Sequence, residues 1–362
     1  MILKSITISC FKNISELNTG FSPKLNCITG SNGSGKTNLL DAVYYLAMTK
    51  SYFPGPDLNT ISYDSPFCRV AGEFLREDRS FENISFTLER EGKKQIQRNL
   101  KPYTRFSDHV GLVPIVMISP YDSCLINESG EERRKFMNSI LSQLDKEYLR
   151  RLQNYNHLLM QRNRHLKSDS VNFDLLDAIS DRLCHNAAYI YDKRREFSEQ
   201  LLPVAYKYYK ILSGGREEID ICYKSDIESS PLSELLDINR EKDLALKYTT
   251  TGIQRDDLVF LMGGHPFRLS ASQGQQKSFL IALKLAQFEI MRDIHKKLPV
   301  LLLDDVFDKL DIKRVEALLN MVSSDLFGQI FISDSNKVRV SEMLKNINGN
   351  SVLLELEEGR LK

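Results

Sequence analysis

The strongest indication of the fold is the stretch Leu25-Asn26-Cys27-Ile28-Thr29-Gly30-Ser31-Asn32-Gly33-Ser34-Gly35-Lys36-Thr37. A short run with β-branched residues leads into a G-x-x-x-x-G-K-T loop, and residues 38–48 have the pattern of an amphipathic helix. This order of strand, glycine-rich loop and helix is the context of a phosphate-binding P-loop. The stretch therefore predicts binding of a nucleoside triphosphate, ATP.

The residue types in this loop suit a triphosphate and its metal ion. Glycines let consecutive backbone N–H groups point at phosphate oxygens, and the start of the following helix adds a positive field. We expect Lys36 to reach the β- and γ-phosphates and the Thr37 hydroxyl to hold Mg²⁺. The predicted nucleotide contacts in the loop are Gly30, Ser31, Asn32, Gly33, Ser34, Gly35, Lys36, Thr37 and Asn38.

Composition and charge describe an ordinary globular protein. The 362 residues suggest about two domains, and the net charge of +1 means that any nucleic-acid surface must be local. The six cysteines are widely spaced without a C-x-x-C pair, which predicts reduced thiols. No apolar run approaches the roughly 20 residues that span a bilayer. We therefore expect a cytoplasmic protein with no membrane partner.

The pattern of the chain changes twice. Residues 1–122 read as strands around the P-loop helix, whereas residues from about 131 to 212 are helical, with long charged side chains and almost no glycine. A strand pattern returns at residues 219–223. We expect an α/β head formed by residues 1–122 and 213–362, with a helical arm, residues 123–212, inserted between its two parts.

Positive charge is concentrated in the first half of the expected arm. Residues 133–167 include nine basic side chains and two acidic ones. A solvated helix face is the usual meaning of such a run, but its asymmetry in a neutral protein also fits contact with a phosphate backbone. The candidate DNA-binding residues are Arg133, Arg134, Arg150, Arg151, Arg162 and Arg164.

Three segments in the last third resemble the remaining parts of a nucleotide site. Ser272-Gln273-Gly274-Gln275 opens a helix, where a phosphate can be bound. The apolar run Val300–Leu303 predicts a buried parallel strand that ends in Asp304 and Asp305. We expect Asp304 to direct Mg²⁺ and Asp305 to act as the base for the attacking water. A Leu310-Asp311 pair follows.

The order of these motifs is that of an ABC-type ATPase head. In that class two heads share each ATP, so Ser272, Gly274 and Gln275 of one molecule would meet the nucleotide on the P-loop of another, with Asp311 nearby. The predicted catalytic residues are Lys36, Ser272, Gly274 and Asp305, in an ATP-dependent homodimer. Asp305 is shorter than the glutamate common in such heads, which predicts slow, switch-like hydrolysis.

Several strings resemble the RecF family of bacterial recombination mediators over essentially the whole chain. They are Phe11-Lys12-Asn13, the P-loop and its helix, Ser119-Pro120-Tyr121-Asp122 with Arg133-Arg134-Lys135-Phe136, Gly252 with Arg255-Asp256-Asp257, and Ala271–Lys277. The resemblance implies an ATP-driven clamp on duplex DNA or single-strand/double-strand junctions. It also implies RecO and RecR as partners in loading RecA.

The chain departs from related heads at three places. Ile253-Gln254 stands where the family has Pro-His, no glutamine lies near Ser119, and Asp334 rather than histidine follows the strand at residues 329–333. Two alternatives remain open from the residues: a transporter cassette, and the ATPase of an ATP-dependent nuclease. The long insertion argues against the first, and the length of the chain against the second.

Overall fold

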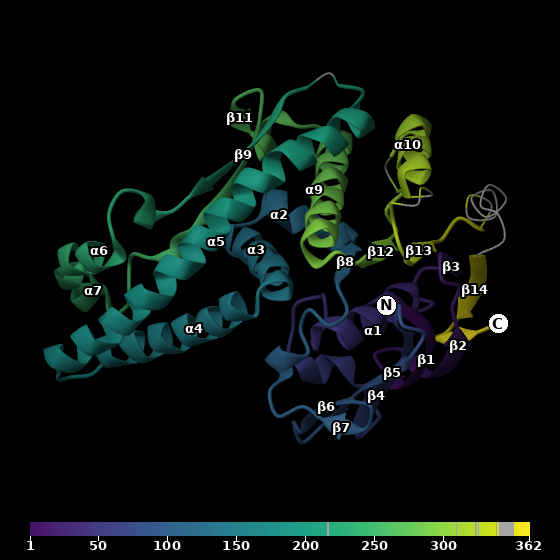
Figure 1. Ribbon diagram of the computed structural model, residues 1–362, viewed down its shortest axis with the longest axis horizontal. Helices are drawn as coiled ribbons and strands as arrows, with labels where there is room; N and C mark the ends of the chain where they lie inside the picture. The colour runs from purple at the N-terminus through teal and green to yellow at the C-terminus, as the bar shows by residue number, and fades with distance from the viewer. Residues whose placement is uncertain (216, 309, 323, 325, 338, 340–350) are drawn as a thin grey trace. The chain divides into compact units, whose positions relative to one another are not determined.

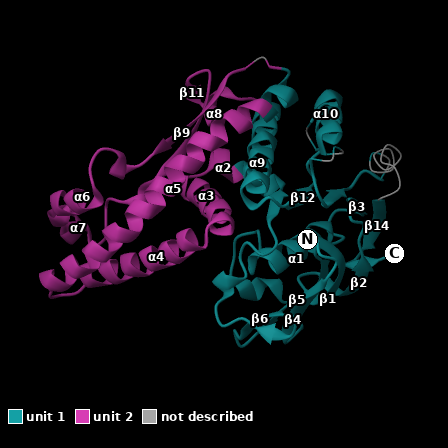
Figure 2. Ribbon diagram, in the orientation of Figure 1, with its two compact units in different colours: residues 1–123, 208–214, 273–362 teal, residues 124–207, 215–272 magenta. Residues whose placement is uncertain are grey.

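The computed structural model describes residues 1–215, 217–308, 310–322, 324, 326–337, 339 and 351–362 (Figure 1). These residues form two compact units (Figure 2). Unit 1 consists of Met1–Ser123, Tyr208–Gly214 and Gln273–Lys362; unit 2 consists of Cys124–Lys207 and Gly215–Ser272.

A mixed sheet forms the centre of unit 1. Its strands, in spatial order, are β15 (Arg360–Leu361), β14 (Ser351–Glu357), β3 (Leu25–Thr29), β13 (Ile330–Asp334), β12 (Val300–Asp304) and β8 (Ile115–Ile118). All of these pairs are parallel except β14–β15. Every residue of β3, β8, β12 and β13 is buried, as expected for parallel strands covered on both faces.

The register of these strands brings the motifs together. Asp304 of β12 pairs with Ser333 of β13, and Asp334 pairs with Thr29 of β3. Because parallel strands end at the same edge, the residues that follow β3 and β12 meet there. The P-loop and the two aspartates therefore share one edge of the sheet.

An antiparallel sheet completes the strand structure of unit 1. Its order is β2 (Ile14–Gly20), β1 (Ile2–Phe11), β4 (Phe67–Leu75), β5 (Phe81–Glu89), β6 (Lys94–Arg98) and β7 (Lys101–Pro102). Burial alternates along β4 and β5, so each has one face toward the core. Helix α1 (Lys36–Met48) contacts strands of both sheets, and nearly all of it is buried.

Unit 1 also contains α9 (Gln273–His295), α10 (Ile312–Val322) and the end of α5 (Phe173–Ser213). Short 3₁₀ segments occur at Asp57–Thr60, Phe106–Asp108 and Pro120–Ser123. Helix α9 packs on β8, which borders β12, and its middle is continuously buried. This fixes the strand that ends in the two aspartates.

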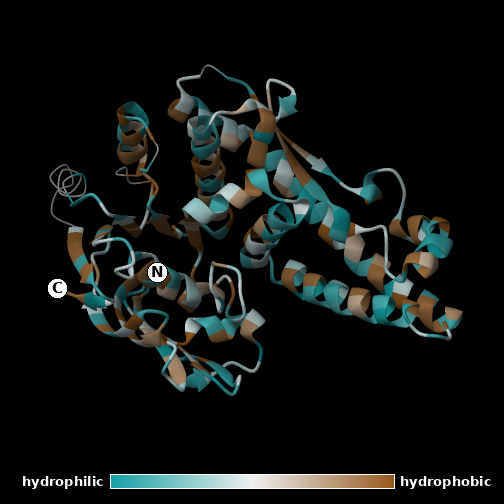
Figure 3. Ribbon diagram, turned by 180° about the vertical axis from the view of Figure 1, so that it is seen from behind, coloured by the Kyte–Doolittle hydropathy of each residue, from teal (hydrophilic) through white to brown (hydrophobic). Residues whose placement is uncertain are grey.

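Unit 2 is mainly helical. Its helices are α2 (Cys124–Asn127), α3 (Gly130–Leu144), α4 (Lys146–Leu166), most of α5 (Phe173–Ser213), α6 (Leu232–Ile238), α7 (Arg240–Leu246) and α8 (Phe267–Ser270). Asp145 caps α4 by accepting the backbone N–H groups of Glu147 and Tyr148. Apolar residues recur between polar ones along α4, as expected for an amphipathic helix (Figure 3).

Unit 2 also contains a small antiparallel sheet, which corrects the expected domain boundaries. Its strands are β11 (His265–Pro266), β10 (Asp257–Met262) and β9 (Ile219–Lys224), with 3₁₀ segments at Asp226–Glu228 and Ile253–Arg255. The arm was expected to span residues 123–212, but residues 215–272 cluster with it and not with the head. The strand pattern at residues 219–223 had led us to assign this segment to the head, because the head is rich in strands.

Ion pairs and hydrogen bonds from arginines explain why residues 252–257 belong to unit 2. Arg194 of α5 donates to Asp256 at 2.5 Å, and both side chains are almost fully buried. Arg133 of α3 binds Asp257 at 2.7 Å, and Arg134 donates to the Asp256 carbonyl. The Arg255-Asp256-Asp257 string thus ties the small sheet to the arm helices.

No helix within the described ranges combines the length and apolarity needed to cross a membrane.

Candidate nucleotide-binding and catalytic site

The loop at residues 30–35 requires glycine at its two ends. Gly30 has φ +155°, and a Cβ there would lie 2.3 Å from the Leu356 carbonyl oxygen of β14. Gly35, with φ +105°, precedes α1 and has the Asn13 side chain 3.1 Å from an ideal Cβ. Neither backbone conformation nor space suits a larger residue. Strand β14 therefore packs closely against the start of the P-loop.

Lys36 is buried inside this loop. Its ammonium donates to the carbonyls of Gly30 and Ser31 at 2.9 and 3.0 Å. The buried Ser34 hydroxyl makes no hydrogen bond to any described residue. Phosphate oxygens would accept from both groups, so the loop has the donors that a triphosphate needs.

Asn38 was predicted to contact nucleotide, but its side chain contacts Asn13. The Asn38 amide donates to Asn13 at 2.7 Å, and the Asn13 amide donates to the Gly33 carbonyl at 2.9 Å. This chain of bonds links α1, the β1–β2 turn and the middle of the loop. Asn13 was not among the predicted site residues, although it belongs to the Phe11-Lys12-Asn13 string of the RecF family.

Thr37 and Asp304 form the candidate Mg²⁺ site. The Thr37 hydroxyl lies 2.9 and 3.0 Å from the two Asp304 carboxylate oxygens. Ser333 donates to the same carboxylate at 2.6 Å, which orients it. Burial raises the pKa of Asp304, while the bonds from Ser333 and Thr37 oppose that shift. A hydroxyl and a carboxylate beside a phosphate loop fit Mg²⁺, which takes few protein ligands and completes its shell with phosphate and water.

Asp305 follows directly, in a constrained backbone conformation. Its φ is +44°, and its backbone N–H donates to the Ser333 carbonyl and hydroxyl at 3.2 and 3.1 Å. One carboxylate oxygen is buried and has no partner among the described residues. Burial, and then the neighbouring Asp304 charge, raise the pKa of Asp305. A carboxylate whose pKa is raised is a better proton acceptor, as a base for water requires.

The segment predicted to act across a dimer lies at the start of α9. Ser272 is exposed and ends unit 2, and Gln273 begins the helix. Arg314 of α10 donates to the Gly274 carbonyl and the Ser278 hydroxyl at 2.7 and 2.8 Å. Lys277 donates to the Asp305 carbonyl at 3.3 Å. These two cations connect the start of α9 to the segment that follows β12.

Asp311 makes local contacts at the beginning of α10. Its carboxylate accepts from the Arg314 backbone N–H at 3.0 Å and pairs with the Arg314 guanidinium at 3.1 Å. It therefore caps that helix. A contact of Asp311 or Gln275 with nucleotide, as predicted, stays a prediction.

The positions that depart from related heads, and the segment near Ser119, are held by ion pairs or hydrogen bonds. Asp334 is buried and binds Arg339 at 2.6 Å. Near Ser119, Asp122 binds Lys284 at 2.9 Å and also accepts from Tyr52. Gln254 accepts from the Tyr155 hydroxyl and donates to the Thr251 carbonyl. Each of these side chains thus stabilises the fold locally.

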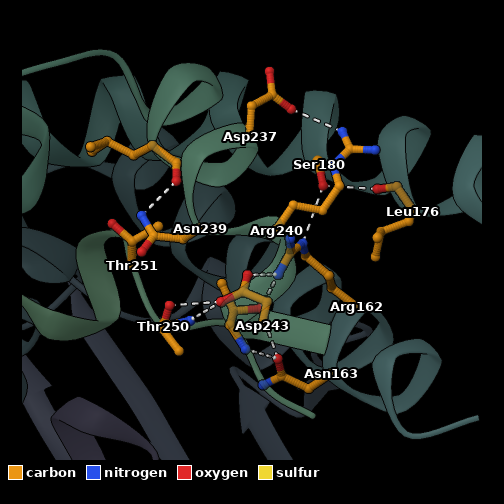
Figure 4. A network of polar contacts seen from close by, with 12 residues as sticks. Arg162, Asn163, Leu176, Ser180, Asp237, Asn239, Arg240, Asp243, Thr250 and Thr251 are labelled. Atoms are coloured by element: carbon orange, nitrogen blue, oxygen red, sulfur yellow. Dashed lines mark hydrogen bonds and ion pairs between the residues drawn. The ribbon is translucent and has the colours of Figure 1, made fainter. Parts of the chain in front are cut away.

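Five of the six arginines proposed for DNA make contacts within unit 2, and three of them are held by residues far away in sequence. Arg133 and Arg134 hold Asp257 and the Asp256 carbonyl, as described above. Arg162 is 1% exposed and binds Asp243, Thr249 and Ser180 at 2.6, 2.7 and 3.1 Å (Figure 4). A buried guanidinium cannot reach a DNA backbone, so the assignment of Arg162 was wrong. The spacing of Leu158, Arg162 and Leu166, which are all buried in α4, was a signal for this position, but the partner Asp243 is far away in sequence.

The other three candidates remain at the surface. Arg150 and Arg164 are exposed, and Arg151 is partly exposed. Arg150 and Arg151 both bind Glu147, at 2.5 and 2.6 Å. Their exposure is compatible with contact to a DNA backbone.

Comparison with known proteins places this geometry in a family. The RecF/RecN/SMC N-terminal domain model matches residues 2–352. The DNA replication and repair protein RecF of Parabacteroides distasonis is 42% identical over 362 residues, covering 100% of this chain and 99% of that protein. That of Flavobacterium johnsoniae is 43% identical over 350 residues, covering 96% and 97%.

The chain belongs to the RecF family. A solved structure of the recombination mediator protein RecF with ATP in the RecFOR pathway has a TM-score of 0.89 and 28% identity, covering 100% of this chain and 97% of that one. An Smc head bound to the C-terminal winged-helix domain of ScpA, at TM-score 0.60 and 16% identity, shares the fold. The expected ABC-type ATPase head is thereby confirmed, and RecF membership selects against the transporter and nuclease alternatives.

Proposed function

We propose that this RecF-family chain is an ATP-switched DNA-binding protein of recombinational repair and replication restart. The observation that carries the proposal is the position of Lys36, Thr37, Asp304 and Asp305 at one edge of the mixed sheet. Such a site suits ATP hydrolysis. Family membership supports coupling of that hydrolysis to DNA.

Within this site each residue has a distinct task. Lys36 would exchange its loop carbonyls for phosphate oxygens, and the P-loop N–H groups would hold the triphosphate. Thr37 and Asp304 would hold Mg²⁺, which when bound neutralises part of the triphosphate charge. Asp305 would orient the attacking water and accept its proton. We expect a weak ATPase, because the short Asp305 side chain positions water less well than glutamate would.

ATP would join two heads. Ser272 and Gly274 at the start of α9 would meet the γ-phosphate on the P-loop of a second copy, since a helix N-terminus attracts anions. ADP lacks that phosphate and would release the dimer. The joined heads would clamp duplex DNA or a single-strand/double-strand junction in the cytoplasm.

The partners follow from the family. Solved relatives are described as members of the RecFOR pathway, which supports RecO and RecR as partners of this chain. In that setting the clamp would mark gapped DNA and promote RecA loading.

The decisive experiment measures DNA affinity and oligomeric state together. Fluorescence anisotropy on duplex, gapped and single-stranded oligonucleotides is read beside sedimentation velocity, without nucleotide, with ADP and with ATP. We expect ATP to produce dimers and to raise affinity for duplex and gapped DNA. Nucleotide-independent affinity, or a monomer at saturating ATP, contradicts the proposal.

A further inference from the structure

A pocket in unit 2 gathers basic and amide side chains from two helices. Its volume is about 400 Å³. Helix α4 contributes one turn, and α5 contributes another. The lining residues are Arg150, Arg151, Asn154, Asp181, Arg182, His185 and Asn186.

We propose that this pocket binds a backbone phosphate of DNA, with Arg182 as the contact that the sequence did not indicate. The inference rests on the proposed DNA binding and locates one of its anchors. Three arginines line this pocket, and Asp181 is the single acidic residue in its lining. Guanidinium groups bind phosphate in a bidentate manner, so this set suits a phosphodiester.

The residues that line the pocket are accessible to a DNA backbone. Arg150, Asn154, Arg182 and His185 are exposed. Within the described part of the chain Arg182 makes no ion pair, in contrast to the buried Arg162 and Arg194. Its charge is therefore available to an incoming anion.

One side of the pocket is held in place. The Arg151 guanidinium donates to the His185 carbonyl at 3.2 Å and lies 5.1 Å from the centre of the Tyr189 ring. The Tyr189 hydroxyl in turn donates to Asp145 at 2.7 Å. Holding Arg151 in this way reduces the side-chain entropy lost when a phosphate binds.

Glu147 competes for the same arginines. It binds Arg150 at 2.5 Å and Arg151 at 2.6 Å. The hydrogen bond from Arg150 lowers the pKa of Glu147 to about 2, so the carboxylate is charged at neutral pH. A phosphate must share or displace these bonds. Removing the Glu147 charge should therefore strengthen DNA binding.

The test uses the full chain and a fluorescein-labelled gapped duplex in the presence of ATP and Mg²⁺. Each phosphate contact contributes about 0.9 to the slope of log affinity against log salt. Arg182→Ala should lower that slope by about 0.9 and weaken binding about eightfold at 0.1 M salt. Glu147→Gln should instead raise affinity without reducing the slope.

Arg195→Ala is the matched control. Arg195 is also an exposed arginine of α5 but does not line the pocket, so its loss should leave the slope unchanged. DNA-free ATP hydrolysis and thermal unfolding should be the same in all variants, which excludes misfolding.

The outcomes separate the two proposals. If the wild type fails to bind DNA with ATP, the proposed function fails. If the wild type binds and both Arg182→Ala and Glu147→Gln leave slope and affinity unchanged, the pocket assignment alone is overturned. An equal loss in Arg195→Ala and Arg182→Ala would also overturn it, since it would indicate diffuse attraction.

Discussion

Replacing Arg162 with alanine should destabilise unit 2 and should not act primarily on DNA binding. The Arg162 and Asp243 side chains are 2% and 0% exposed, and their charged atoms are 2.6 Å apart. Asp243 also accepts the Thr250 N–H and hydroxyl at 2.8 and 2.7 Å (Figure 4). The pair therefore joins α4 and α7 to the segment around residues 249–251.

The magnitude follows from the burial. Removing one partner of a buried ion pair leaves an uncompensated charge and costs about 3–5 kcal/mol. The Asp243 carboxylate would keep its bonds from Thr250, which places the expected loss near the lower end, about 3 kcal/mol. A loss of this size changes an opening equilibrium by about a hundredfold.

Urea unfolding followed by far-UV circular dichroism gives the loss of free energy. Hydrogen exchange at Thr249 and Thr250 tests whether opening is localised there. Arg164→Ala is the matched control, because Arg164 is an exposed arginine on the same helix. Its stability should stay within about 0.5 kcal/mol of the wild type.

Two results would refute this reasoning. One is equal stability of Arg162→Ala and Arg164→Ala. The other is a selective loss of DNA affinity in Arg162→Ala with unchanged hydrogen exchange, which would mean that the guanidinium reaches solvent and DNA.

Four further predictions concern the nucleotide site. Lys36→Ala should abolish ATP binding measured by calorimetry, because the triphosphate loses its main cation; unchanged affinity would refute the P-loop assignment. Asp305→Asn should retain ATP yet slow turnover by about 10²–10⁴-fold and accumulate dimers, and normal hydrolysis would show that Asp305 is not the base. Asn13→Ala should weaken ATP binding about fivefold, since one loop hydrogen bond of about 1 kcal/mol is lost; an unchanged Kd would contradict a supporting role. Ser272→Arg should spare ATP binding by the monomer and block dimerisation. Mixing this variant with Lys36→Ala should restore part of the ATPase activity, at most about half. The reason is that one composite site of the heterodimer carries both substitutions and the other carries neither. No recovery in proven heterodimers would mean that the two sites act together or that Ser272 acts in its own chain.

The sequence by itself determined the features whose chemistry is local. The P-loop is contiguous, so glycine spacing and the following Lys36-Thr37 were enough to predict it, and the apolar run before Asp304 identified its strand. The ABC-type head and the RecF family followed from the order of such strings. Thr37 and Asp304 were both expected at the Mg²⁺ site, and the structure places the Thr37 hydroxyl 2.9 Å from an Asp304 carboxylate oxygen.

Only the tertiary structure decided which arginines are available. Arg162 and Arg164 are two residues apart, yet one is buried against Asp243 and the other is exposed. The same long-range pairing assigned residues 215–272 to unit 2, through Arg194 and Asp256. The tertiary structure also brings the Asn13 amide to the Gly33 carbonyl of the P-loop. Hydrogen-bond and charge partners distant in the chain set these outcomes. The periodicity of α4 places Arg162 on the same face as the buried Leu158 and Leu166, but it cannot identify Asp243 as the partner.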